Sequence, residues 1–233
     1  MLPLLRDKKV IFFDVGYTLD YPASGDWMLT RAFLDRAGEK LRLWSGGQIR
    51  EAMEAGLCDL LRCHRLTTVE EEIRQFTGFY RALSDRLALG FAPEDAARIA
   101  RDRALNMENY IPYPGVVQVL ETLSRTHRLG VISDTWPSIL PQLEHLGVSR
   151  YLKYRTFSCF VGALKPDPRI FEDALRQCGA APEETVFIDD SARNLEGAAA
   201  LGITPVLIAA NPDADVETPF VKIRDLRELT ADP

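Results

Sequence analysis

The chain has 233 residues, a formal net charge of −6 and 46% hydrophobic residues. The acidic balance argues against nucleic acid or an anionic membrane as a partner, because both are bound through positive surface. No apolar run approaches the ~20 residues of a membrane span, the N-terminal run is too short for a signal peptide, and the four cysteines are scattered. We therefore expect a cytoplasmic protein with reduced cysteines.

The chain opens with a strand and then becomes helical. Residues 9–13 are β-branched and aromatic, which is typical of a strand buried on both faces of a parallel sheet. From about residue 27 to 106, apolar side chains recur at helical spacing without a strand signal, which predicts four helices. We expect an all-helical cap subdomain at 21–110, inserted into an α/β core of 1–20 and 111–233.

Strands and helices alternate in the rest of the chain. The pattern predicts helices over 115–126, 136–146, 168–178 and 192–201, and strands over 128–133, 185–188 and 204–208, with a short edge strand and a helical turn in the tail. This alternation is typical of a doubly wound, Rossmann-like parallel sheet.

Three of the predicted strands end in polar clusters, namely residues 14–18 (DVGYT), 133–135 (SDT) and 189–191 (DDS). The carboxyl ends of parallel strands line one edge of a sheet, so the clusters should converge on one crevice. Asp134 and Ser191, taken alone, are equally well read as turn or helix N-cap residues. Asp189 and Asp190 facing Asp14 repel one another, so either a carboxyl is protonated or a cation lies among them. Oxygen ligands of this kind suit Mg²⁺.

Lys165 lies in a loop stiffened by Pro166 and Pro168. A lysine held toward the crevice would neutralise a nucleophilic carboxylate and a substrate phosphate. A solvated loop lysine is the alternative interpretation.

Together these segments resemble the motifs of haloacid dehalogenase-like (HAD) hydrolases. The matching stretches, in the family's order, are FFDVGYTL (12–19), VISDT (131–135), KPDPRIF (165–171) and VFIDDSARNLEGA (186–198). The resemblance covers nearly the whole chain and includes a helical cap inserted after the first strand. It implies a hydrolase with a covalent aspartyl intermediate.

The resemblance also implies a role for each matching residue. Asp14 would be the nucleophile, and the catalytic group would comprise Asp14, Ser133 and Lys165. Mg²⁺ would be held by Asp14, the carbonyl of Gly16, Asp189 and Asp190, whereas Asn194 would lie outside the ligands. Substrate would be bound by Thr18, Ser133, Asp134 and Lys165, with Thr18 supporting the loop.

One position departs from the family's phosphatases. They usually carry an aspartate two residues after the nucleophile, which protonates the leaving oxygen, and here that position is Gly16. A positioned acid–base group contributes about 10²–10⁴-fold in rate. The possible substitutes near in sequence are Tyr17, Asp20, Tyr21 and Asp26. Alternatively, the substrate has a good leaving group, such as an acyl phosphate or an anomeric sugar phosphate, or turnover has been lost.

Three functions therefore remain open. The first is a Mg²⁺-dependent phosphatase of a small phosphorylated metabolite. The second is a 2-haloacid dehalogenase, which needs neither the acid missing at Gly16 nor a cation. The third is a binding or regulatory module. The adjacent acids Asp189 and Asp190 favour phosphoryl chemistry, because dehalogenation would leave them unneutralised beside Asp14. The sequence identifies neither the substrate nor the oligomeric state.

Overall fold

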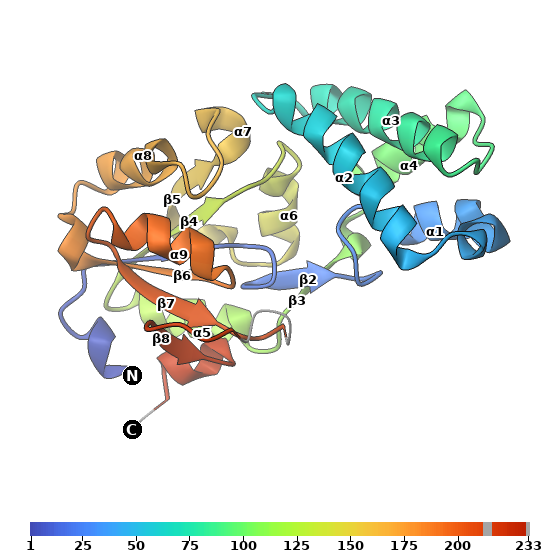
Figure 1. The fold of residues 1–233 in the computed structure, drawn as a ribbon. Coiled ribbons are helices and arrows are strands. Elements are labelled where there is room, and N and C mark those ends of the chain that lie inside the picture. The colour runs from blue at the N-terminus through green and yellow to red at the C-terminus, as the bar shows by residue number, and fades with distance from the viewer. Residues whose placement is uncertain (212–215, 232–233) are drawn as a thin grey trace. The chain divides into compact units, whose positions relative to one another are not determined.

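The computed structural model describes residues 1–211 and 216–231 (Figure 1). The chain forms two compact units. The first contains Met1–Tyr21, Ile111–Thr135 and Gln142–Pro233, and the second contains Pro22–Tyr110 and Trp136–Pro141. The expected division into a core of 1–20 and 111–233 and a cap of 21–110 stays a prediction, and the grouping of residues 136–141 with the helical residues was not foreseen.

The first unit is built on a six-stranded parallel sheet, which confirms the predicted fold class. The strand order is β5-β4-β1-β6-β7-β8. The bounds are β1 Val10–Phe13, β4 Arg128–Ser133, β5 Leu152–Phe157, β6 Thr185–Asp189, β7 Thr204–Ile208 and β8 Val221–Ile223. Two short strands, β2 (Asp20–Pro22) and β3 (Tyr110–Pro112), pair separately.

The register of the central strands aligns the carboxyl ends of β1, β4 and β6. Phe13, the last residue of β1, pairs with Val131 of β4 on one side and with Ile188 of β6 on the other. The backbone N–H of Asp14 continues the ladder by donating to the carbonyl of Ile188 at 2.8 Å. The polar residues that follow these three strands therefore lie at the same edge of the sheet.

Helices cover both faces of the sheet (Figure 1). α8 (Pro168–Cys178) and α9 (Ala192–Ala199) pack on one face, over a core that includes Phe12, Phe171 and Phe187. α5 (Val116–Ser124) lies on the other face beside the 3₁₀ turn Leu226–Leu229. The remaining helices after β4 are α6 (Ile139–His145) and α7 (Ser158–Val161).

The second unit contains the four predicted helices, which are confirmed as α1 (Arg31–Ala37), α2 (Gly46–Arg62), α3 (Val69–Arg86) and α4 (Pro93–Leu105). Capping boxes at Ser45 and Thr68 begin α2 and α3. Phe33, Phe76 and Tyr80 are fully buried in the unit's own core. Among the described residues, no helix is both long and apolar enough to cross a membrane.

β5 is the strand of the six-stranded sheet that the sequence pattern did not predict, and the short strands β2 and β3 were not predicted either. The burial of β5 alternates, with Lys153 and Arg155 exposed between buried residues, because it is the edge strand of the sheet. The charged residues interrupt the apolar run by which the inner strands are recognised.

Asp20 is fully buried where the chain enters β2. Its Oδ2 accepts a hydrogen bond from Nε2 of Gln142 at 2.6 Å, whereas Oδ1 has no partner in the part of the chain that the structure describes. Burial raises the pKa of this carboxyl to about 8, with a contribution from the charge of Asp14. Asp20 is therefore protonated at neutral pH.

Gly197→Ala should destabilise the protein by about 1–3 kcal/mol. A Cβ at Gly197 would lie 2.5 Å from Cβ of Pro166 and 3.0 Å from the Pro166 carbonyl oxygen, so the backbone of that loop must move. Gly78→Ala in α3 is the matched control, since a Cβ there meets nothing within 4 Å. Thermal melting should show a loss only for Gly197→Ala, and equal melting temperatures would contradict the close contact.

Asp20→Asn should stabilise the protein progressively as pH rises from about 4 to about 8. The folded chain retains a proton on Asp20 that the unfolded chain has released, so wild-type stability falls with pH through this window, whereas asparagine does not titrate. Urea denaturation at about pH 5 and about pH 8 should give a difference that grows by about 3–4 kcal/mol. The same difference at both pH values would show that Asp20 is ionised when folded.

Candidate active site

Asp14 lies directly after β1, at the edge where β1, β4 and β6 end. The residue is 8% exposed, and its Oδ1 is 2.7 Å from Nζ of Lys165. Burial raises the pKa of Asp14 to about 7, with Lys165 acting against burial and Asp189 adding to it. The Asp14 carboxyl group is thus slightly exposed, and its pKa lies close to neutral pH.

Among the described residues, Lys165 is the cation that pairs with these carboxylates. Its ammonium has three donors, and three acceptors lie around it: Oδ1 of Asp14 at 2.7 Å, Oδ2 of Asp189 at 2.7 Å and the carbonyl of Ile132 at 3.3 Å. Burial opposes its charge, but Asp14 and Asp189 outweigh burial and hold the pKa of Lys165 above its ordinary value. The interpretation as a solvated loop lysine is therefore wrong.

The loop that carries Lys165 is fixed at both ends. The backbone N–H of Lys165 donates to Oδ1 of Asp134 at 2.9 Å. Asp167 caps α8 by accepting from the N–H of Arg169, and Pro166 packs against Gly197 of α9. The rigidity expected from the flanking prolines is thus supplemented by contacts from three directions.

Asp189 is fully buried at the end of β6, and three groups donate hydrogen bonds to its carboxylate. Its Oδ1 accepts from the N–H of Ser191 at 2.7 Å, and its Oδ2 accepts from Lys165. The amide of Asn194 lies 3.2 Å from both oxygens. This carboxylate therefore holds Lys165 in place.

Asp190 differs from its neighbour because it is only partly buried. Burial raises its pKa to about 7, and the charges of Asp14 and Asp189 raise it further. Carboxylate oxygens of Asp14, Asp189 and Asp190 lie within 4.8 Å of one another. Three carboxylates face one ammonium, and their oxygens are the donors that a hard divalent cation prefers. The residues therefore fit such an ion.

The remaining predicted residues lie around this group. Ser133 is buried at the end of β4, and the next turn is held by Thr135, whose N–H donates to Oγ of Ser158 at 2.8 Å. Thr18 is fully buried, and its hydroxyl finds no partner among the described residues. Gly16 forms an isolated β-bridge with Asp20.

Tyr113 lies near the site and had no motif to reveal it. Its ring is tilted against that of Tyr21 with centroids 5.0 Å apart, and burial together with the charge of Asp190 raises the pKa of its hydroxyl to about 12. Tyr17 has a φ of +55°, which is unusual for a bulky side chain and is maintained only by surrounding contacts. Its N–H donates to the carbonyl of Asp20 at 2.7 Å.

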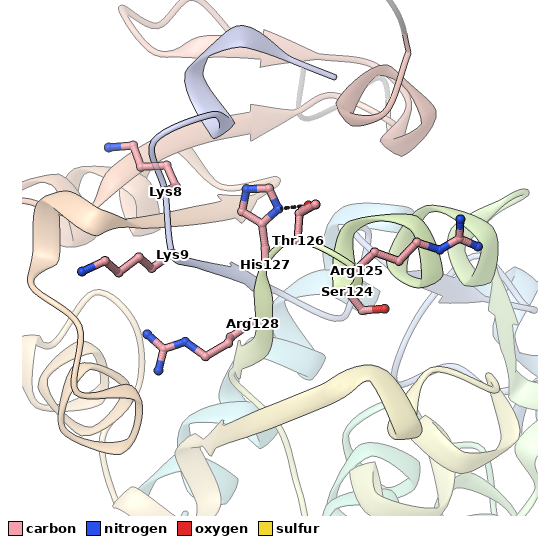
Figure 2. Close-up of a pocket in the computed structure, with 7 residues that line it drawn as sticks. All are labelled: Lys8, Lys9, Ser124, Arg125, Thr126, His127 and Arg128. Carbon is pink, nitrogen blue, oxygen red and sulfur yellow. Dashed lines mark hydrogen bonds between the residues drawn. The ribbon is translucent and has the colours of Figure 1, made fainter.

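Figure 2 shows a separate hollow, at the amino ends of β1 and β4. Its cations are already engaged: Lys8 donates to the carbonyl of Glu183, Lys9 pairs with Glu184, and Arg128 donates to the hydroxyl of Tyr154. The acidic group at the carboxyl ends of the strands is thus the better candidate for catalysis.

Curated relatives match over most of the chain. It is 26% identical over 250 residues to a glyceraldehyde 3-phosphate phosphatase of Methanopyrus kandleri, covering 96% of this chain and 99% of that protein. It is also 26% identical over 237 residues to phosphoglycolate phosphatase 1 of Pseudomonas aeruginosa, covering 96% and 79%.

Solved structures share the fold at lower identity. A 2-haloacid dehalogenase from Pseudomonas syringae pv. Tomato superposes with a TM-score of 0.64 at 23% identity, covering 96% of both chains. A HAD phosphatase from Thermococcus onnurineus superposes with a TM-score of 0.56 at 21% identity, covering 95% of both chains. The shared fold therefore does not choose between these two reactions.

The family model for haloacid dehalogenase-like hydrolases matches residues 8–202, which include Asp14, Ser133, Lys165 and the Asp189–Asp190 pair. This chain belongs to the haloacid dehalogenase-like hydrolases.

Proposed function

We propose that this hydrolase is a Mg²⁺-dependent phosphatase of small phosphorylated metabolites and that Asp14 is its nucleophile. The observation that carries the proposal is the charge balance at the sheet edge, where three carboxylates face one buried ammonium. Dehalogenation needs no cation and would leave this surplus uncompensated. The curated relatives, whose names include phosphatases of glyceraldehyde 3-phosphate, phosphoglycolate and phosphoserine, support a small phosphorylated substrate.

We assign the ion to oxygens of Asp14, Asp190 and the Gly16 carbonyl. A bound Mg²⁺ would neutralise the carboxylates and polarise the phosphoryl oxygens. Asp189 is the less direct partner in this assignment, because both of its oxygens already accept hydrogen bonds and one of them holds Lys165. Asp190 is only partly buried, and among the described residues it forms no ion pair.

In the proposed reaction, Asp14 attacks phosphorus in line, and the bond from phosphorus to the leaving oxygen breaks. Lys165 keeps Asp14 ionised and shares its donors with the phosphoryl oxygens. Ser133 and the neighbouring backbone N–H groups bind the same oxygens as negative charge develops. Water then hydrolyses the aspartyl-phosphate and restores Asp14.

The leaving oxygen has no carboxylic acid beside it at Gly16. Asp20 is a poor substitute, because it is fully buried and bonded to Gln142. Substrates whose leaving group needs little protonation, such as acyl phosphates and anomeric sugar phosphates, should therefore be hydrolysed best.

Dehalogenation remains the second candidate, because expulsion of halide does not need the acid that is missing at Gly16. A panel of acyl phosphates, sugar phosphates and 2-haloacids, each with Mg²⁺ and with chelator, separates the candidates. Phosphate release that needs Mg²⁺ supports the proposal, whereas halide release in the presence of chelator supports a dehalogenase. No release of phosphate or halide from any substrate supports a binding module.

Asp14→Asn should abolish turnover, with a fall of more than about 1,000-fold in kcat, and leave the fold intact. The amide keeps the shape of the carboxyl group but cannot form the covalent intermediate. Asp7→Asn, at an exposed position of the same unit, is the matched control. Mass spectrometry of protein incubated with substrate should find an added phosphoryl group in the wild type and in Asp7→Asn but not in Asp14→Asn, and full activity of Asp14→Asn would refute the assignment.

Asp190→Asn should raise the Mg²⁺ concentration needed for half-maximal activity by about 10–100-fold, because it removes a ligand. Asp189→Asn should mainly lower thermal stability, since the buried ammonium of Lys165 loses one of its two anionic partners. Magnesium titrations and melting curves of both variants test this difference. An unchanged Mg²⁺ requirement in Asp190→Asn would exclude it as a ligand.

A further inference from the structure

The segment Trp136–Pro141 follows Ser133, Asp134 and Thr135 directly in the chain but groups with the helical unit. We infer that Glu72 of α3 is a positioning residue that anchors this segment and thereby fixes the loop that carries Ser133. The inference rests on the proposed function, because it assigns Ser133 to phosphoryl binding.

Glu72 is fully buried, and its carboxylate collects three hydrogen bonds. Oε2 accepts from the backbone N–H of Ser138 at 2.8 Å, and Oε1 accepts from the Ser138 hydroxyl at 2.7 Å. Oε1 also pairs with a guanidinium nitrogen of Arg103, on α4, at 2.9 Å. Two of the three bonds therefore hold the segment, and the third joins Glu72 to Arg103 of α4.

The other groups around this carboxylate hold the same segment. The Arg103 guanidinium lies 3.7 Å from the ring centroid of Phe76 and 5.1 Å from that of Trp136. The indole N–H of Trp136 donates to Oε1 of Gln75 at 3.1 Å, and its ring packs edge-on against Phe76. Trp136 and Ser138 are thus fixed by side chains from α3 and α4.

The preceding residues are fixed within the sheet unit. Asp134 accepts from the N–H of Lys165, and Thr135 donates to Ser158. One peptide bond, between Thr135 and Trp136, separates the residues held by the sheet unit from those held by the helical unit. The backbone that follows Ser133 is therefore bonded within the sheet unit up to Thr135 and within the helical unit from Trp136.

A buried ion pair is an expensive way to stabilise a helical core, because apolar residues of similar volume do so at least as well. The pair of Glu72 and Arg103 differs from apolar packing in one respect, which is that it supplies acceptors to Ser138. Misplacement of a binding group by about 1 Å can cost about 10²-fold in rate. The anchoring of Ser138 therefore explains why the core of the helical unit contains the pair of Glu72 and Arg103.

The test removes the anchor and keeps the core. The double variant Glu72→Leu/Arg103→Met replaces the ion pair with apolar side chains, so that the helices stay folded while Ser138 loses both acceptors. Glu72→Gln is a second variant that retains one acceptor. Glu70→Gln, at an exposed position of the same helix, is the control.

Two readouts are measured, namely hydrogen exchange of the peptide covering 133–141, and kcat and KM for p-nitrophenyl phosphate with Mg²⁺. In the double variant we expect at least about tenfold faster exchange in 133–141, unchanged exchange in α2, and a kcat about 10–100-fold lower with KM changed less. Glu72→Gln should be intermediate, and Glu70→Gln should match the wild type.

Each result has a distinct meaning. Unchanged exchange in 133–141, or a kcat within twofold of the wild type in a folded double variant, would overturn the inference. If the double variant unfolds, the same limits apply to Glu72→Gln. If the wild type itself releases no phosphate from any substrate, the proposed function fails, while the exchange result still decides whether Glu72 anchors the segment.

Discussion

The buried ammonium of Lys165 is the interaction on which the rest of the site depends. It joins Asp14, at the end of the first strand, to Asp189, at the end of a strand more than 170 residues later in the chain. Without this cation the two carboxylates would face each other at low dielectric, where like charges are strongly unfavourable. The sheet register brings the acids together, and Lys165 makes their proximity tolerable.

The same balance of charges gives Asp189 and Asp190 different roles. Asp189 accepts hydrogen bonds from Lys165, Ser191 and Asn194, so it holds the lysine in place. Asp190 is less buried, and burial together with the charges of Asp14 and Asp189 raises its pKa. Adjacent residues thus differ because alternate side chains of a strand end point to different surroundings.

The loop after β4 connects this electrostatic centre to the helical unit. Its first residues are bonded to the Lys165 backbone and to Ser158, and the residues that follow are bonded to Glu72. Before Trp136 the loop is bonded to Lys165, which pairs with Asp14 and Asp189, and after it the loop is bonded to Glu72, which pairs with Arg103. In both places a charged side chain also hydrogen-bonds the backbone of this loop or its neighbour, which orients that backbone more strictly than apolar packing would.

The sequence by itself determined the sheet, the four helices of the second unit and the convergence of the polar clusters, because apolar periodicity and strand-end position are local properties. It did not indicate β5, whose charged edge hides the strand pattern. Only the tertiary structure decided that Lys165 is buried, that Asp189 and Asp190 differ, and that Glu72 holds Ser138. Each of these features depends on which groups, distant in the sequence, meet in the low-dielectric interior. The spacing of residues along the chain does not predict those contacts.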